Sequence, residues 1–268
     1  MLGSEPWERR IKNRSEVQRE YQDEKWGGLL ARVEESPWQL KLSDLDAIMQ
    51  GGDEVVLFSD GPDLFETTAR DAHLRYRDFV AETLKPYLDA SAIVELGAGY
   101  GSVIVDLARR PEFSGLPAYG LDLTKAGADL IGRMAAAEGV NVNSGLCDML
   151  ADEIANSAIP EGALVFTSYA AHYEPRHAAS FVEGIAALRP GRVVLIEPCH
   201  EHCDESTLLG LLRRRYIEVN DYNTNLVTLL HEQREAGRIR ILDERRAAFG
   251  PNPLLAASVI VWEPVDRN

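Results

Sequence analysis

Residues 93–102, IVELGAGYGS, join an apolar run to a turn that has glycine at positions 97, 99 and 101. Glycines in such a turn allow a tight change of direction and let a ligand approach the main chain closely. A helical pattern follows over residues 103–110, so the stretch predicts a strand, a tight turn and a helix. Some glycine turns bind nothing, and the surrounding residues therefore have to identify a ligand.

Acidic and polar residues follow this strand and the next two. Glu95 precedes the glycines, where a carboxylate can meet a cationic amino acid ligand. Asp122 ends the next apolar run, roughly twenty residues beyond the glycines, and a carboxylate there can accept hydrogen bonds from both hydroxyls of a ribose. Cys147 and Asp148 follow the third run, within reach of an adenine amino group. The glycine spacing also differs from the G-x-G-x-x-G fingerprint of dinucleotide sites.

Short apolar runs alternate with helical patterns from residue 91 onward, which is typical of βαβ units and a mainly parallel sheet. Strands are expected over residues 92–96, 118–121, 140–143, 163–167, 192–196, 238–245 and 257–262. Helices are expected over residues 103–110, 126–138, 176–188, 206–219 and 226–236. The N-terminal third lacks this alternation, and segments such as 43–49 and 69–84 read as amphipathic helices. We therefore expect an α/β protein with a helical cap over residues 1–90 and a sheet domain over residues 91–268.

Composition narrows the function classes. The 268 residues carry a formal net charge of -15, which disfavours a nucleic acid partner because phosphate affinity depends on lysine and arginine. No apolar run is long enough to cross a bilayer, and the first residues lack the apolar stretch of a signal peptide. Three cysteines are too few for a disulfide framework. These features predict a soluble cytoplasmic protein with no membrane partner.

The order of these segments resembles the class I, Rossmann-like methyltransferases that depend on S-adenosylmethionine (SAM). The resemblance covers roughly residues 91–197 and rests on the segments VELGAGYGS, GLDLT, GLCDML, ALVFTSYAAHYEP and VVLIEP. It implies a seven-stranded, mainly parallel sheet whose last strand is antiparallel, with SAM as cofactor and S-adenosylhomocysteine (SAH) as product. The cofactor contacts that it implies are Glu95, Gly97, Ala98, Gly99, Asp122, Leu123, Cys147, Asp148 and Ser168.

The segment after the fourth expected strand, residues 167–175, lies where this family meets the methyl group and the acceptor. Tyr169, His172 and Glu174 are its catalytic candidates. A neutral histidine can remove a proton from the attacking hydroxyl or amine, and a carboxylate can orient an amine or guanidine. The alternative for each residue is a structural role at a helix N-terminus.

The segment after the fifth expected strand, residues 197–205, is dense in polar groups. Cys199, His200, His202 and Cys203 lie closer together in sequence than the ligands of usual zinc sites, so we predict no metal and read the segment as a substrate-facing loop or a solvated turn. Substrate contacts are assigned here to Glu197, His200 and Glu201. The many carboxylates of this region favour a cationic acceptor.

Tyr21 and Trp26 lie in a helical stretch that ends in glycines. N-terminal elements of this kind close over cofactor and substrate in the family, so both residues are predicted to contact the substrate from a lid. Plain packing of the two rings is the alternative.

We therefore expect an enzyme, a SAM-dependent methyltransferase that acts on nitrogen or oxygen of a small molecule in secondary metabolism, such as an amine, guanidine or amino acid. A peptide or protein acceptor, a non-catalytic SAM-binding protein and an NAD-dependent oxidoreductase are the alternatives. The sequence leaves the oligomeric state open, with a homodimer as one alternative.

Overall fold

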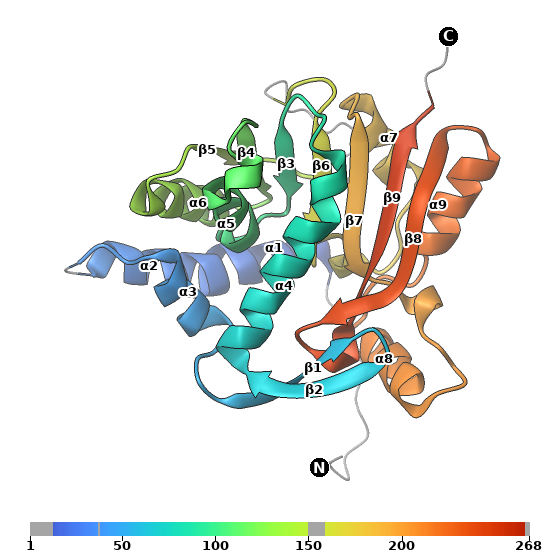
Figure 1. The fold of residues 1–268 in the computed structure, drawn as a ribbon, viewed down its shortest axis with the longest axis horizontal. Helices are drawn as coiled ribbons and strands as arrows, with labels where there is room; N and C mark the ends of the chain where they lie inside the picture. The colour runs from blue at the N-terminus through green and yellow to red at the C-terminus, as the bar shows by residue number, and fades with distance from the viewer. Residues whose placement is uncertain (1–12, 37, 150–158, 266–268) are drawn as a thin grey trace.

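A single mixed sheet forms the centre of the computed structural model, which describes residues 13–36, 38–149 and 159–265 (Figure 1). Its strands are β1 (Val55–Asp60), β2 (Asp63–Thr68), β3 (Ile93–Leu96), β4 (Ala118–Asp122), β5 (Val142–Leu146), β6 (Leu164–Ser168), β7 (Arg192–Pro198), β8 (Ile239–Gly250) and β9 (Ala257–Pro264). They are hydrogen-bonded in the order β2-β1-β8-β9-β7-β6-β3-β4-β5. The described sheet thus has nine strands, and the expectation of seven is wrong.

The parallel block of the sheet consists of β5, β4, β3, β6 and β7. Each of β3 and β7 is a nearly continuous buried run, as expected for strands that are covered on both faces. β9 lies between β7 and β8 and runs antiparallel to both, which confirms the expected direction of the last strand. The carboxyl ends of the parallel strands consequently meet at one edge, where ligands of such sheets bind.

A β-hairpin within the N-terminal third corrects the expectation of a purely helical cap. β1 and β2 pair antiparallel through a turn at Gly61, whose φ is +58°, and β1 joins β8 through Ser59 and Asp60. Phe58 anchors the hairpin because its ring packs on Phe65 and Phe249, with centroids 5.4 and 5.6 Å away. Two apolar runs flanking an Asp-Gly turn are a hairpin signal that the sequence already contained.

Helices cover both faces of the sheet. On one face lie α4 (Ala69–Leu84), α5 (Ser102–Arg109) and α6 (Lys125–Glu138), and on the other α7 (Ala179–Ala187) and α9 (Leu226–Glu235). Each layer has its own cluster of buried apolar side chains. α8 (Leu208–Val219) packs near the segment Pro253–Leu255 that precedes β9. The sheet is therefore the middle of three layers, and helices pack on both of its faces.

The N-terminal helices α1 (Arg14–Arg19), η1 (Glu20–Lys25), α2 (Trp26–Glu35) and α3 (Leu42–Met49) lie beside the sheet domain, on the side of α6. Glu34 of α2 forms an ion pair with Arg133 of α6 at 2.5 Å, and Glu138 accepts a hydrogen bond from the Leu42 amide at 2.9 Å. η1 is a π-helical segment, a wider turn that is often found at functional sites.

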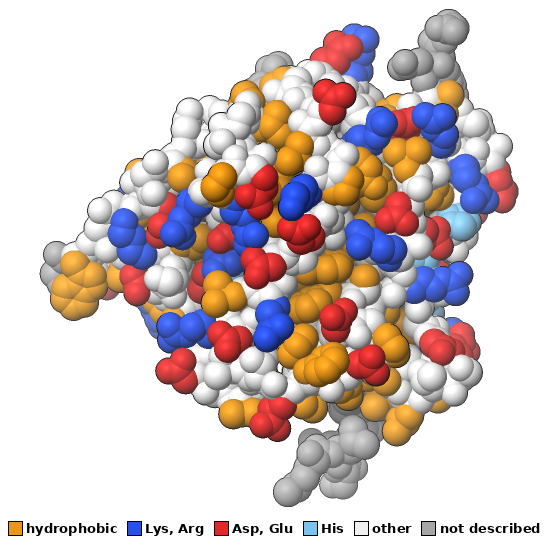
Figure 2. All heavy atoms as spheres, viewed as in Figure 1, with side chains coloured by type: hydrophobic (Ala, Val, Ile, Leu, Met, Phe, Trp, Pro, Cys, Tyr) orange, Lys and Arg blue, Asp and Glu red, His pale blue; other side chains and the backbone are white. Residues whose placement is uncertain are grey.

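The molecular surface mixes charges of both signs. Figure 2 shows lysine and arginine side chains interspersed with aspartate and glutamate over the face that carries α4. In the described residues, no helix is both long enough and apolar enough to cross a membrane.

Candidate functional site

The glycine turn after β3 has the close backbone approach that its sequence predicts. The Gly97 and Ala98 amides both donate to the Leu121 carbonyl of β4, at 2.8 and 2.9 Å. Gly97 has φ +74°, and a Cβ at this position would lie 2.4 Å from the Cβ of Ala170. Only glycine therefore lets the turn pass this close to the end of β6.

Glu95 orders the turn by binding the helix that follows it. Its side chain is buried, and its Oε2 accepts a hydrogen bond from the Ile104 amide in the first turn of α5 at 3.0 Å. Burial raises the pKa of Glu95 well above 4.5 even though this hydrogen bond lowers it. The carboxylate consequently links β3 to α5 across the turn.

Asp122 ties the end of β4 to the same turn. Its Oδ2 accepts from the Gly99 amide at 2.9 Å, and its Oδ1 accepts from the amide and hydroxyl of Thr124 at 2.8 and 2.7 Å. Burial raises the pKa of Asp122 above 3.8 despite these hydrogen bonds. The structure thus holds two buried carboxylates, those of Glu95 and Asp122, at one edge of the sheet.

A cavity of about 540 Å³ opens at this edge. All of the residues expected at a cofactor line it: Glu95, Gly97, Ala98, Gly99, Asp122, Leu123, Cys147, Asp148 and Ser168. The opposite part of the lining is largely aromatic and includes Tyr76, Tyr169 and Tyr173. Residues that are far apart in the sequence thus line one cavity.

The N-terminal helices cover one side of the cavity. Trp26 lies so close to the glycine turn that a Cβ at Gly99 would be 2.8 Å from its indole ring. The Trp26 ring also packs on Tyr21 and Tyr100, with centroids 5.4 and 5.5 Å away. Tyr21 and Trp26 both line the cavity, at the position expected for a lid.

Two of the three catalytic candidates, Tyr169 and Glu174, line the cavity. Tyr169 has a φ of +52°, a backbone conformation that is costly for a large side chain and that clusters at functional sites. Its hydroxyl donates to the Leu255 carbonyl at 2.6 Å, and burial raises its pKa. The phenol therefore stays protonated at neutral pH, which suits it to positioning and not to proton removal.

His172 and Glu197 do not line the cavity, and the expected contact of His172 with the acceptor is corrected. The His172 side chain is 1% exposed, and its Nδ1 lies 3.1 Å from Glu197 Oε2. The Glu197 side chain is fully buried and accepts hydrogen bonds from the amides of Ala170, Ala171 and His172 at 2.9–3.3 Å. Glu197 thus holds the backbone of residues 170–172 from behind, because it accepts hydrogen bonds from three consecutive amides there.

The residues expected to form a substrate-facing loop after β7 point elsewhere. His200 Nε2 lies 3.2 Å from Glu218 Oε1, and Glu201 Oε1 accepts from the Thr228 amide at 3.0 Å. Neither residue lines the cavity. The expected preference for a cationic acceptor rested on the carboxylates of residues 174 and 197–205, and of these only Glu174 is among the described lining residues. Burial raises the pKa of Cys203 to about 11. Within residues 13–36, 38–149 and 159–265, no group of three or more His, Cys, Asp or Glu side chains is placed to hold a metal ion.

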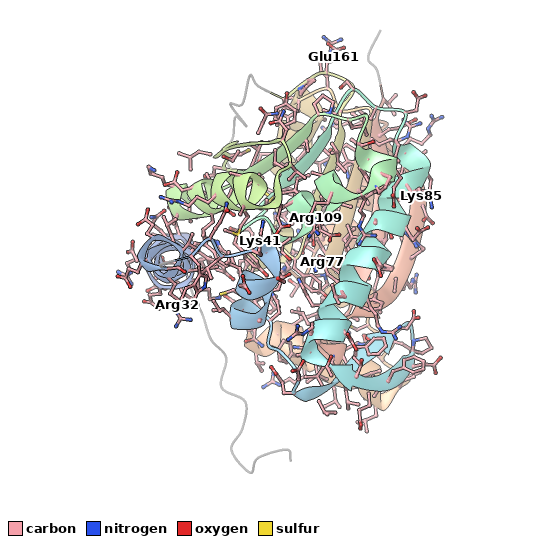
Figure 3. All side chains as sticks on the ribbon, turned by 60° about the vertical axis from the view of Figure 1, so that its left-hand side comes forward. Arg32, Lys41, Arg77, Lys85, Arg109 and Glu161 are labelled. Atoms are coloured by element: carbon pink, nitrogen blue, oxygen red, sulfur yellow. The ribbon has the colours of Figure 1, made fainter. Side chains whose placement is uncertain are left out.

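A buried polar network beside the cavity was missed from sequence. His73 and Ser102 line the cavity, and His73 Nε2 lies 2.8 Å from Ser102 Oγ. Behind them, Asp46 of α3 accepts from Ser102 Oγ at 3.0 Å and from Arg77 at 2.8 Å. Arg77, labelled in Figure 3, lies between α4, α3 and α5. His73, Tyr76 and Arg77 lie three and four residues apart and so share one face of α4. This spacing of polar groups on the buried face of α4 is the sequence signal for the network.

No family model and no curated protein matches the sequence. Solved structures do match. Magnesium protoporphyrin IX methyltransferase from Synechocystis PCC 6803, solved with bound SAH, is 14% identical with a TM-score of 0.56 over 95% of this chain and 100% of that chain. A putative sarcosine dimethylglycine methyltransferase from Galdieria sulphuraria is 15% identical with a TM-score of 0.56, over 85% of this chain and 98% of that chain.

An O-methyltransferase family protein from Burkholderia thailandensis is also similar, with 15% identity and a TM-score of 0.52 over 74% of this chain and 59% of that chain. The first two of these structures match the present chain over 95% and 85% of its length. The protein therefore has the fold of the class I, SAM-dependent methyltransferases.

Proposed function

We propose that the protein is a SAM-dependent methyltransferase that acts on a small molecule. The observation that carries the proposal is the convergence of the glycine turn, Glu95, Asp122 and Asp148 on one cavity. The structural neighbours support it, since they are methyltransferases and one of them holds SAH.

The charge of the cavity favours SAM over NAD. In the described chain no lysine or arginine lines it, whereas Glu95, Asp122, Asp148 and Glu174 do. SAM carries a sulfonium and an ammonium against one carboxylate, so it brings net positive charge to these acids. The pyrophosphate of NAD would bring two negative charges into a cavity whose described lining contains acids and no lysine or arginine.

The lining residues fit the parts of SAM separately. Asp122 is proposed to accept hydrogen bonds from the ribose hydroxyls, and Leu123, Cys147 and Asp148 to surround the adenine. The glycine turn and Ser102, at the N-terminus of α5, are proposed to hold the methionine part, since the positive end of a helix dipole favours a carboxylate. When bound, the cofactor supplies an electrophilic methyl group on a good leaving group.

Methyl transfer then requires alignment and one route for a proton. The acceptor atom has to lie about 3 Å from the methyl carbon and in line with the departing sulfur. Tyr76, Tyr169 and Tyr173 are proposed to pack against the acceptor, and Glu174 is the lining carboxylate proposed to take its proton. We propose a nitrogen or oxygen nucleophile. The enclosing N-terminal helices favour a small acceptor over a protein side chain.

Calorimetric titration with SAH, with NAD as the control, tests the cofactor. Binding of SAH alone is the expected result and would justify a screen of methyl acceptors by mass spectrometry. Binding of NAD in place of SAH would refute the proposal, and binding of SAH without turnover of any acceptor would favour a non-catalytic SAM-binding protein.

Replacing Asp122 with alanine is expected to weaken SAH binding by about 1–3 kcal/mol, because a buried, hydrogen-bonded carboxylate is lost from the ribose site. Asp129, an exposed acid on α6 that pairs with Lys125, provides the matched control, and Asp129→Ala should bind SAH like the parent. Calorimetry of both variants, with circular dichroism to verify folding, makes the comparison. Equal affinity of a folded Asp122→Ala protein and the parent would exclude the ribose assignment.

A further inference from the structure

One buried carboxylate, that of Asp46, receives two hydroxyl groups from the cavity wall. Tyr100 and Ser102 flank Gly101 at the start of α5, and both donate to Asp46 Oδ1, at 2.9 and 3.0 Å. Burial raises the pKa of the Tyr100 phenol, which therefore keeps its proton. Each hydroxyl has only one proton, and that proton points at Asp46. The two oxygens can consequently only accept further hydrogen bonds.

These directions decide which atoms of the next two residues meet the hydroxyls. His73 Nε2 lies 2.8 Å from Ser102 Oγ, so the proton of the neutral ring is on Nε2 and Nδ1 is the acceptor nitrogen. The Gln50 side-chain nitrogen donates to the Tyr100 hydroxyl at 3.4 Å, which leaves Gln50 Oε1 as an acceptor. His73 and Gln50 both line the cavity. Asp46 thus orients two cavity residues so that each offers an acceptor.

This end of the cavity, beside the glycine turn, suits a positively charged group. In the described lining there is no lysine or arginine, and the carboxylates of Glu95 and Asp122 already accept hydrogen bonds from main-chain amides. His73 and Gln50 add two neutral acceptors to these acids. Neutral acceptors can bind an ammonium and, unlike a further acid, do not repel a carboxylate that lies next to it.

We infer that His73 Nδ1 and Gln50 Oε1 hold the α-ammonium group of the methionine part of SAM, and that Asp46 positions both residues through Ser102 and Tyr100. The inference rests on the proposed function, in which the carboxylate of the same amino acid group lies at the N-terminus of α5. His73 belongs to α4, and Gln50 follows the last residue of α3. The N-terminal third of the chain then takes part in selecting the cofactor, by recognising a charge that adenosine alone lacks.

Two ligands that differ only in the α-amino group test this assignment: SAH, and a deaminated analogue in which hydrogen replaces that group. In calorimetry, His73→Phe is expected to bind SAH about tenfold more weakly than the parent, because a hydrogen bond to a charged group is lost. It should bind the deaminated analogue as the parent does. His231→Phe, on α9 and outside the cavity lining, is the matched control and should bind both ligands like the parent.

A second variant and a second measurement guard against an effect on folding. Gln50 is exposed, so Gln50→Met should leave the fold intact, and it should weaken binding of SAH about threefold without changing that of the deaminated analogue. Nitrogen-15 NMR of the imidazole rings reports the tautomer directly. The signals that disappear in His73→Phe should show the proton on Nε2 in the parent, and a proton on Nδ1 would overturn the inference.

The remaining outcomes separate this inference from the proposed function. Equal losses of affinity for both ligands in His73→Phe would overturn it, because the ring would then have only a structural role. Unchanged affinity for SAH in His73→Phe and Gln50→Met, with both variants folded by circular dichroism, would overturn it as well and leave the methyltransferase proposal intact. Failure of the parent to bind SAH would overturn both.

Discussion

Replacing Asp46 with alanine is expected to lower the free energy of unfolding by about 3–5 kcal/mol, because it leaves a buried arginine without its main counter-charge. Arg77 is 6% exposed, and its guanidinium lies 2.8 Å from Asp46 Oδ2. Its other carboxylate partner, Asp106, is 3.8 Å away. Asp46 Oδ1 also accepts from the Tyr100 and Ser102 hydroxyls at 2.9 and 3.0 Å, so several buried donors lose their acceptor at once.

The pH dependence of this contribution follows from the pKa of Asp46. Burial alone would raise that pKa. The hydrogen bond from His73 and the charge of Arg77 lower it by more than burial raises it, so the pKa of Asp46 lies below 3.8. A carboxylate with a lowered pKa in the folded state stabilises the protein above its unfolded pKa, and the contribution is lost as the pH falls through the folded value. Asp46→Ala should therefore lose most stability at neutral pH and differ less from the parent in acid.

Urea unfolding measures the change. Asp78 is the matched control, since its exposed carboxylate pairs with Arg110 at 2.7 Å and Asp78→Ala should cost at most about 1 kcal/mol. The double variant Asp46→Leu, Arg77→Met should recover part of the loss, because it removes the unpaired charge along with the polar site. A loss below about 1 kcal/mol in Asp46→Ala would show that Arg77 finds another partner.

The same network fixes the protonation pattern of a cavity residue. Ser102 donates its hydroxyl proton to Asp46, so its oxygen is left to accept from His73 Nε2–H. In the neutral imidazole, Nδ1 is then the acceptor nitrogen. Loss of Asp46 would free Ser102 and permit the other tautomer of His73. We therefore expect Asp46→Ala to weaken SAH binding as well as stability.

The sequence identified the cofactor side of the site because that chemistry is local. Strand, turn and helix follow one another within residues 93–110, Asp122 ends β4, and Asp148 lies two residues beyond the end of β5. The parallel order of the strands then brings these segments together without any further information. Each expected cofactor residue consequently lines the cavity.

The acceptor side could not be predicted in the same way, because it depends on which way side chains point after packing. His172 and Glu174 are two residues apart, yet His172 is buried behind the cavity and Glu174 lines it. Asp46 and His73 come from helices whose mutual packing no local pattern specifies. The hairpin of β1 and β2 differs, since its signal, an Asp-Gly pair between two apolar runs, is present in the sequence.

Replacing Glu197 with glutamine is expected to destabilise the protein by about 2–3 kcal/mol despite its equal size. Glu197 Oε1 accepts from the Ala170 and Ala171 amides, and Oε2 faces the amide and ring nitrogen of His172. A glutamine can supply one acceptor oxygen, but its NH₂ group would then face the His172 amide, so that two hydrogen-bond donors would oppose each other. Because the segment carries Tyr169 and Tyr173, its displacement should also alter the acceptor side of the cavity more than the cofactor side.

Acid unfolding distinguishes this role from simple packing. Burial alone would raise the pKa of Glu197. The interaction with His172 and the hydrogen bonds from the Ala170 and Ala171 amides lower it by more, so the pKa of Glu197 lies below 4.5. The parent should therefore lose this contribution as the pH falls through the folded value, whereas Glu197→Gln lacks it throughout. Urea unfolding from neutral pH to about pH 3 should show the two proteins converging in acid, and Glu161→Gln, on the exposed side chain labelled in Figure 3, should follow the parent. Parallel stability profiles of Glu197→Gln and the parent would mean that Glu197 is not ionised in the folded protein, and its support of residues 169–173 would then rest on neutral hydrogen bonds alone.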